Sequence, residues 1–223
     1  MRVFVTGASG WIGSATVDEL LAAGHEITGL ARSDASAAAL QAEGARVRRG
    51  DLDDLASILA GAEAAEAVGV RAVSLRFAPT VHGAGDHGFI ATIAAVARDK
   101  GVSGYPGDGT NRWAAVHRSG AGRLVALGLA KAPAGARLHA VAEEGVSTRD
   151  IAEAIGRAFG LPVTSIAPDD VQSHFGWIGT FFGMDLAATS TVTRELLGWE
   201  PTGPTLIEDL DAGAYSAGTP RAE

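Results

Sequence analysis

The feature that most constrains this fold is an apolar strand that runs directly into three glycines spaced three residues apart. Residues 3–5 form the strand, and Gly7, Gly10 and Gly13 follow before an amphipathic helix. The first glycine allows a tight turn, the second lets a dinucleotide's pyrophosphate approach the backbone, and the third lets helix and strand pack closely. The N–H groups at the helix start then face the anion. The stretch therefore predicts dinucleotide binding, with a glycine-rich turn that binds nothing as the alternative.

The elements that follow this loop support the prediction. Apolar residues at helical spacing give residues 12–21 one buried face, and residues 26–30, 34–42 and 46–49 read as strand, helix and strand. Alternating strands and helices with short connections predict right-handed parallel βαβ units, whose ligand lies at the carboxyl ends of the strands. The residues predicted to hold the cofactor there are Gly7, Ser9, Gly10, Trp11, Ile12 and Gly13.

The end of the second strand indicates which nucleotide is preferred. An acidic residue about twenty residues after the glycines would bind a ribose 2′-hydroxyl, whereas this chain has Arg32 and Ser33 at that place. An arginine fork pairs well with a 2′-phosphate, and a serine adds a hydrogen bond. We therefore expect NADP, while Asp34 keeps NAD possible and a solvated surface arginine is the structural alternative.

Composition narrows the class of protein. The chain has 223 residues, a formal net charge of −8, no cysteine, 47% hydrophobic and 20% charged residues. Its length suits one domain plus a smaller lobe, and its acidity disfavours nucleic-acid and anionic-membrane partners. Without cysteines or a His-x-x-x-His pair, no metal site is expected. No long apolar run or signal-peptide pattern is found, so we expect a cytoplasmic protein.

The glycine spacing, together with Thr6, Ala8, Ser9 and the Gly-Asp-Leu at 50–52, resembles the short-chain dehydrogenase/reductase superfamily. Later residues resemble its extended NAD(P)-dependent epimerase/dehydratase group. The resemblance implies an α/β fold, with a Rossmann-like doubly wound parallel sheet over residues 1–142 and a small C-terminal substrate lobe over 143–223. Asp51 and Leu52 match the position that flanks the adenine, although Asp51 or Asp53 would equally suit a helix N-cap.

A large piece of that family's fold is absent from the sequence. Residues 54–68 read as one Ala-rich helix interrupted by Gly61, and the strand at 72–77 follows. In extended family members two further βα units precede that strand, so roughly sixty residues are missing, with a junction near 61–64. Three explanations stay open: a segment omitted from the sequence, a genuine deletion in which 72–77 replaces the fourth strand, or an unrelated rearrangement.

The absent piece would carry the family's Tyr-x-x-x-Lys helix, whose tyrosine moves the proton. Tyr105 and Tyr215 are this chain's tyrosines, and neither has a lysine four residues later. An unassisted phenol with a pKa near 10 is a poor base at neutral pH. The catalytic residues therefore stay unknown at this stage.

The second half of the chain supplies the candidate substrate residues. The resemblance implies that Pro79, Thr80 and Val81 form a loop beside the nicotinamide, and that the glycine-rich stretch 83–89 lines the substrate cleft. His82 and His87 are candidate substrate contacts, with loop or cap roles as the alternative. Arg112 is the candidate for binding a phosphate or carboxylate, and Trp113 for an apolar wall, although both also fit a turn and a buried strand.

The C-terminal region completes the resemblance. Residues 191–201 look like the family's closing helix and Leu-Gly-Trp turn. The aromatic residues of 174–184 indicate a core or a dimer interface, with a wall beside the cofactor as the alternative. The sequence thus predicts an NADP-dependent oxidoreductase or epimerase that transfers hydride between the nicotinamide and a small hydroxy or carbonyl substrate, and that forms a possible homodimer. The alternative is a non-catalytic NADP-binding redox sensor or regulatory module.

Overall fold

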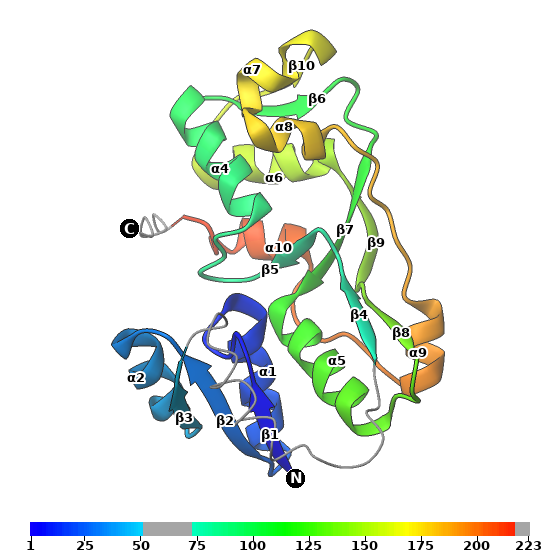
Figure 1. Ribbon diagram of the computed structural model, residues 1–223. Coiled ribbons are helices and arrows are strands. Elements are labelled where there is room, and N and C mark those ends of the chain that lie inside the picture. Colours follow the sequence, from blue (N-terminus) through cyan, green and yellow to red (C-terminus); the bar gives the residue numbers. More distant parts are fainter. Residues whose placement is uncertain (51–72, 217–223) are drawn as a thin grey trace. The chain divides into compact units, whose positions relative to one another are not determined.

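The structure is a computed structural model that describes residues 1–50 and 73–216 (Figure 1). The chain forms two compact units. Unit 1 comprises Met1–Leu75, Arg118–Leu138 and Thr193–Trp199, and unit 2 comprises Arg76–His117, His139–Val192 and Glu200–Glu223. The units interleave along the sequence, whereas the sequence suggested two consecutive segments divided at residue 142. The reason is that strands from 80–117 pair with strands from 143–166, so both stretches share one core.

Unit 1 begins with the predicted βαβ arrangement. It contains β1 (Arg2–Val5), α1 (Trp11–Ala22), β2 (Glu26–Ala31), α2 (Asp34–Ala42) and β3 (Arg46–Arg49). The three strands are parallel in the order β1-β2-β3, with Val3 opposite Ile27 and Thr28 opposite Arg46. The parallel α/β character expected from the sequence is therefore confirmed.

The core of unit 1 lies between this sheet and its helices. Val17, Leu20, Ile27 and Leu40 are buried there. Helix α5 (Arg118–Lys131) packs on α1, and Gly122 of α5 lies so close that a Cβ there would be 2.6 Å from the Ala15 carbonyl oxygen. Helix α9 (Thr191–Leu197) leads to Trp199, whose buried indole donates to the Gly120 carbonyl oxygen at 3.2 Å.

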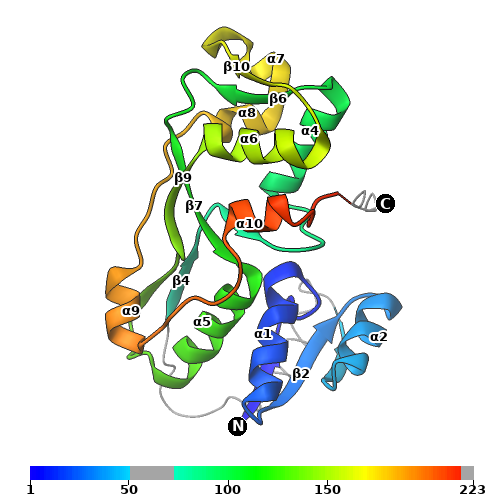
Figure 2. The ribbon, with the colours of Figure 1, turned by 180° about the vertical axis from the view of Figure 1, so that it is seen from behind.

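Unit 2 is built on two small sheets. Strand β5 (Thr80–His82) runs parallel to β7 (Arg112–His117), which pairs antiparallel with β9 (Glu143–Ser147). Strand β6 (Ser103–Pro106) pairs in parallel with β10 (Val163–Ile166). The helices are α4 (Phe89–Lys100), α6 (Thr148–Phe159), α7 (Val171–Phe175), α8 (Trp177–Phe182) and α10 (Leu206–Asp211), with a 3₁₀ turn at Pro168–Asp170. Figure 2 shows α6 and α10 side by side.

Local signals explain where the helices of unit 2 begin and end. Helix α6 starts at Ser147, whose hydroxyl accepts from the Asp150 amide, and stops at Gly160 with a φ of 66°. Helix α10 starts with a reciprocal capping box between Thr205 and Glu208.

The aromatic residues of 174–184 divide between the core and the surface. Phe175 and Phe182 are buried with Trp113, while Trp177 and Phe181 are exposed on α8. None of the helices within 1–50 and 73–216 has both the length and the apolarity needed to cross a membrane.

The remaining strands form a separate two-stranded sheet. Strand β4 (Ser74–Phe77) pairs with β8 (Arg137–Ala140), and the division between the units runs through both strands. Within the described residues, β1 and β4 each have a strand on one edge alone. In the doubly wound order 3-2-1-4-5-6 the first strand has neighbours on both edges. Residues 54–68, the junction at 61–64 and the start of the 72–77 strand lie outside the described residues.

Candidate functional site

The glycine loop of unit 1 has the close packing that a phosphate cradle needs. Gly7 has a φ of 67°, a left-handed conformation that favours glycine, and its carbonyl oxygen accepts from the Gly10 amide at 2.9 Å. A Cβ would lie 3.1 Å from the Gly7 carbonyl oxygen at Gly10 and 1.9 Å from it at Gly13. Glycine is thus required by the geometry of the turn at Gly7 and Gly13, and Gly10 lies in a tight contact.

The start of α1 suits an anion. The N-cap is Gly10, and no side chain caps the helix. The first N–H groups of a helix have no partner within it, and the helix dipole places positive charge there. The amides at this helix start are suited to binding a diphosphate, and Ser9 and the backbone of Trp11 and Ile12 are adjacent to them in sequence.

An arginine that the sequence analysis did not assign lies against the same helix. The Arg118 guanidinium lies 4.4 Å from the centre of the Trp11 ring and donates to the Ser14 hydroxyl at 2.9 Å. The sequence gave no sign of its partners, which lie more than a hundred residues earlier.

A hollow of about 280 Å³ opens at the carboxyl ends of β1 and β2. Its lining residues are Gly7, Ser9, Leu30, Arg32, Ser33, Ser36 and Gly50. The Ser33 hydroxyl accepts from the Ser36 amide at 3.1 Å and donates to the Ser36 hydroxyl at 3.0 Å. The described lining thus offers one arginine and several hydroxyls but no carboxylate. Sequence reasoning found Arg32 and Ser33 and missed Ser36, which one helical turn brings beside Ser33.

The acidic residue at the end of β2 is held by an arginine. Asp34 is fully exposed, and its carboxylate lies 2.8 Å from a guanidinium nitrogen of Arg49. Another nitrogen of Arg49 donates to the Ser33 carbonyl oxygen. Asp34 is not among the residues that line the hollow. This arrangement weakens the argument from Asp34 for NAD.

Other predicted cofactor residues lie elsewhere. Asp51 and Leu52 lie outside the described residues. Thr80 and Val81 form β5 of unit 2 and not a loop, because they pair with β7, and Pro79 precedes them. The Thr80 hydroxyl is buried without a hydrogen-bond partner among the described residues. Contact of these three residues with the nicotinamide stays a prediction.

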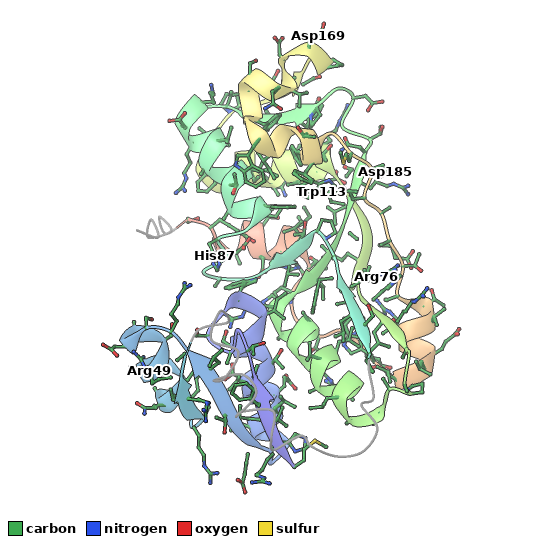
Figure 3. The ribbon with its side chains drawn as sticks, in the orientation of Figure 1. Arg49, Arg76, His87, Trp113, Asp169 and Asp185 are labelled. Carbon is green, nitrogen blue, oxygen red and sulfur yellow. The ribbon has the colours of Figure 1, made fainter. Side chains whose placement is uncertain are left out.

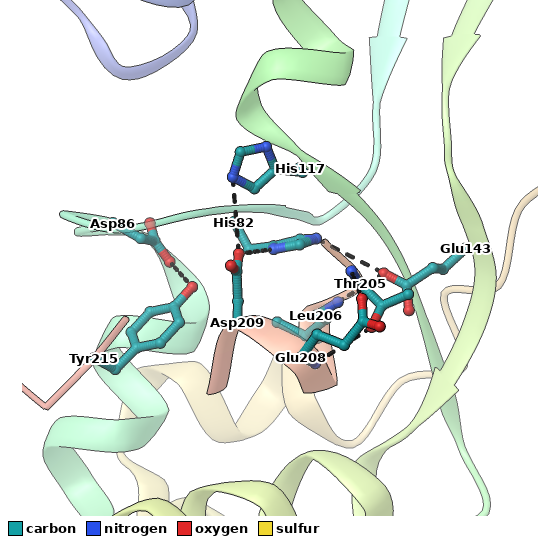
Figure 4. A network of polar contacts seen from close by, with 9 residues as sticks. All are labelled: His82, Asp86, His117, Glu143, Thr205, Leu206, Glu208, Asp209 and Tyr215. Carbon is teal, nitrogen blue, oxygen red and sulfur yellow. Dashed lines mark hydrogen bonds and ion pairs between the residues drawn. The ribbon is translucent and has the colours of Figure 1, made fainter. Parts of the chain in front are cut away.

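A buried polar network surrounds His82 in unit 2 (Figure 4). Its Nδ1 lies 2.6 Å from Asp209 Oδ2, and its Nε2 lies 3.7 Å from Glu143 Oε2. His117 Nε2 lies 3.9 Å from the same Asp209 oxygen. The network joins β5, β7, β9 and α10. Because His82 is 0% exposed, the geometry favours its structural interpretation over a substrate contact.

Two further hydrogen bonds hold helix α10 and the residues that follow it. The Leu206 amide donates to Glu143 Oε2 at 2.9 Å. Tyr215 is buried and donates to Asp86 Oδ2 at 3.0 Å. Burial, followed by the nearby Asp86 charge, raises the pKa of the Tyr215 hydroxyl. Tyr215 is therefore a fixed donor and not a base.

The other candidate substrate residues differ in exposure (Figure 3). His87 is exposed in the loop before α4. Trp113 is buried, with its ring packed against Phe89 and Phe182, so it belongs to the core of unit 2. This corrects the expectation of a substrate wall, because the Trp113 side chain is fully buried and packs among aromatic rings inside unit 2. Arg112, on the opposite face of β7, forms an ion pair with Asp185.

Comparison with known proteins identifies the family. A model described as the NAD dependent epimerase/dehydratase family matches residues 3–63. An uncharacterized protein of Schizosaccharomyces pombe is 36% identical over 294 aligned positions, which cover 96% of this chain and 100% of the relative. The chain belongs to the NAD dependent epimerase/dehydratase family. An uncharacterized Saccharomyces cerevisiae protein is 33% identical over 293 positions, covering 95% and 98% of the two chains.

Solved structures of the family share the fold. A nucleoside-diphosphate-sugar epimerase from Pseudomonas aeruginosa has a TM-score of 0.74 at 13% identity, covering 98% of this chain and 99% of its own. The UDP-glucose 4-epimerase of Thermus thermophilus, solved with NAD, has a TM-score of 0.62 at 17% identity, covering 98% and 100%. These similarities establish a Rossmann-like α/β fold for the family member described here.

The alignment lengths carry a second finding. The alignment with the fission-yeast relative has 294 positions, which exceeds the 223 residues of this chain by 71. At least 71 positions of the alignment therefore pair a residue of the relative with a gap in this chain.

Proposed function

We propose that this chain binds NADP(H) at the β1–α1 glycine loop, and that it belongs to the oxidoreductases and epimerases that transfer hydride between the nicotinamide and a small hydroxy or carbonyl substrate. The observation that carries the proposal is the hollow beside the loop. Its described lining combines Arg32 with the hydroxyls of Ser33 and Ser36 and contains no carboxylate. A 2′-phosphate needs a cation and hydroxyl donors, and a 2′-hydroxyl needs an acceptor.

Each part of the cofactor has residues suited to it. The glycine-loop amides would hold the diphosphate, Arg32 and Ser33 the 2′-phosphate, and Asp51 and Leu52 the adenine. Pro79, Thr80 and Val81 would flank the nicotinamide. When bound, the nicotinamide supplies the hydride chemistry, and the chain's own part is to bind and orient it.

Substitution of Arg32 tests the choice of nucleotide. A hydrogen bond to a charged group contributes about 1.5–3 kcal/mol, so Arg32→Ala should weaken NADPH binding about tenfold to a hundredfold and leave NADH binding unchanged. The control is Arg46→Ala, which removes an exposed arginine of the same sheet that pairs with Glu26 at 3.2 Å. Equal losses in both variants, or an equal loss for both nucleotides, would contradict the assignment.

A second candidate function is a non-catalytic NADP-binding sensor or regulatory module. It is favoured by the placement of the two tyrosines. Tyr215 is buried against Asp86, and the Tyr105 ring lies 5.0 Å from the Arg149 guanidinium. Neither has a lysine beside it in sequence. Neither tyrosine therefore forms the tyrosine-lysine pair that the family resemblance implies for moving the hydroxyl proton.

The missing alignment positions support the same alternative. We propose that most of them correspond to two βα units of about thirty residues each, with the junction near residues 61–64.

Two measurements separate the candidates. The intact mass of the natural protein should match 22.6 kDa if the units are absent, and exceed it by roughly 7 kDa if two βα units are present. NADPH oxidation with a panel of carbonyl compounds should be detectable for the enzyme. Tight NADPH binding without turnover would identify the module.

The remaining parts of the proposal concern the setting of the protein. We propose a small-molecule substrate and a cytoplasmic location. Trp177, Phe181 and Met184 expose apolar surface on unit 2, which supports a homodimer. Light scattering on the purified protein would give the mass of a monomer if that proposal is wrong.

A further inference from the structure

A second hollow, of about 370 Å³, opens on unit 2. Its lining residues are Arg112, Glu144, Gly145, Ala187, Ala188 and Thr189. The segment that carries the last three is fixed by backbone hydrogen bonds on both sides. The Leu186 amide donates to the Arg112 carbonyl oxygen at 2.7 Å, and the Ala188 amide donates to the Glu144 carbonyl oxygen at 2.9 Å. The walls of the hollow are therefore held in place by β7 and β9.

The arginine of this hollow is bound to a carboxylate of the same segment. Arg112 Nε lies 3.3 Å from Asp185 Oδ1, and the terminal NH2 nitrogen lies 3.0 Å from Oδ2. The backbone amide of Arg112 also donates to Oδ1 at 2.7 Å. These hydrogen bonds hold the pKa of the Asp185 carboxyl below its usual range. Asp185 thus accepts three hydrogen bonds from a single residue and occupies the fork that a phosphate would use.

The charges around the hollow are unfavourable for an anion. Arg112 is balanced by Asp185, and Glu144 adds a second carboxylate. Other arginines of unit 2 are engaged away from the hollow: Arg98 over Phe159, Arg149 over Tyr105, and Arg157 with Asp211. A diphosphate in the hollow would face the Glu144 carboxylate and an arginine that is already paired with Asp185.

We propose that Asp185 is a specificity-determining residue: by holding Arg112 in a bidentate ion pair, it excludes diphosphate-bearing substrates from this hollow and selects for an uncharged, hydroxyl-bearing substrate. The Glu144 carboxylate and the Thr189 hydroxyl, which line the hollow, accept hydrogen bonds from such hydroxyls. This distinguishes the chain from structural neighbours named for nucleotide sugars, such as the UDP-glucose 4-epimerase of Thermus thermophilus. The inference rests on the proposed function, because it treats unit 2 as the substrate-binding part.

Asp185→Asn tests the assignment, because it removes the negative charge and keeps the size of the side chain. The probe is UDP-glucose, titrated calorimetrically into the full chain with and without saturating NADPH. We expect Asp185→Asn to bind UDP-glucose at least tenfold more tightly than the unsubstituted chain. The gain should disappear in the double variant Asp185→Asn with Arg112→Gln, since it depends on the released guanidinium.

The matched control is Asp211→Asn. Asp211 forms a pair of the same bidentate form with Arg157 elsewhere in unit 2, with Nε and NH2 each 3.1 Å from a carboxylate oxygen. This variant should bind UDP-glucose no better than the unsubstituted chain. The proposal is overturned if the unsubstituted chain already binds as tightly as Asp185→Asn, if Asp185→Asn gains nothing, or if the gain survives the loss of Arg112.

The same titrations separate this inference from the proposed function. The residues proposed to bind NADPH include none of Arg112, Asp185 and Asp211, so NADPH binding should be equal in all four proteins. Failure of NADPH to bind any of them would contradict the proposed function and leave the UDP-glucose comparison readable, because the titration without NADPH is unaffected.

Discussion

Gly13→Ala is the substitution whose consequence the structure defines most sharply. A Cβ at this position would lie 1.9 Å from the Gly7 carbonyl oxygen and 2.8 Å from the Gly7 carbonyl carbon. Both atoms belong to the backbone, so no side chain can rotate away. Contacts below 3.0 Å are essentially never made by real Cβ atoms, so the loop and the start of α1 must separate by more than 1 Å.

That displacement falls on the groups that would hold the diphosphate. Overpacking of a close contact costs about 1–3 kcal/mol. If this strain is relieved by moving the loop away from α1, the same free energy is lost from a ligand that binds both. At about 1.4 kcal/mol for each factor of ten, we expect NADPH to bind roughly fivefold to a hundredfold more weakly.

The assay is a titration of NADPH fluorescence, with Gly122→Ala as the matched control. A Cβ at Gly122 would lie 2.6 Å from the Ala15 carbonyl oxygen, so this variant also strains backbone in unit 1. It separates α5 from α1 and leaves the glycine loop intact. Gly122→Ala should lower the melting temperature and keep the NADPH affinity within about twofold. If Gly13→Ala binds NADPH as the unsubstituted chain does, the glycine loop is not the phosphate site.

Two further predictions concern the C-terminal part of unit 2. Tyr215→Phe removes the donor that Asp86 Oδ2 uses at 3.0 Å inside the protein. A hydrogen bond to a charged group contributes about 1.5–3 kcal/mol, so urea unfolding should show a loss of that order, and an unchanged midpoint would refute the role. Glu208 accepts from the Thr205 amide at 2.7 Å, which lowers the pKa of its carboxyl. A lowered folded-state pKa stabilises the fold above the unfolded-state pKa of about 4.3 and ceases to do so as the pH falls through the folded value. Glu208→Gln should therefore be less stable than the unsubstituted chain at pH 7 and equally stable in acid, and a difference that persists in acid would contradict this.

The first fifty residues could be predicted well because their signals are local. The strand, the glycine loop and the helix are read from adjacent residues, and the observed β1, α1, β2, α2 and β3 follow the expected order. The spacing of the three glycines also predicts the close backbone contact, in which Gly13 at the start of α1 packs against the Gly7 carbonyl group.

The polar contacts of unit 2 could not be predicted, because they join residues far apart in sequence. His82 and Asp209 are separated by 127 positions, and Arg112 and Asp185 by 73. A single sequence carries no signal for such pairs. From its chemistry alone, Arg112 was therefore predicted to bind an anion. The structure shows that its guanidinium already pairs with Asp185.

Trp113 shows a different limit of sequence reasoning. It lies in a stretch that fits both a substrate loop and a buried strand, and local pattern does not distinguish them. Packing distinguishes them, because the Trp113 ring contacts Phe89 and Phe182. Phe182 belongs to α8, which lies far from Trp113 in the sequence.

The most direct test of the central claim is an equilibrium titration of the unsubstituted chain with NADPH and NADH in parallel. The account predicts saturable binding of one nucleotide per chain, with NADPH at least tenfold tighter than NADH because Arg32 and the serines meet the 2′-phosphate. Equal affinities would contradict the preference for NADP, and the absence of binding by either nucleotide would contradict the assignment of the glycine loop as a cofactor site.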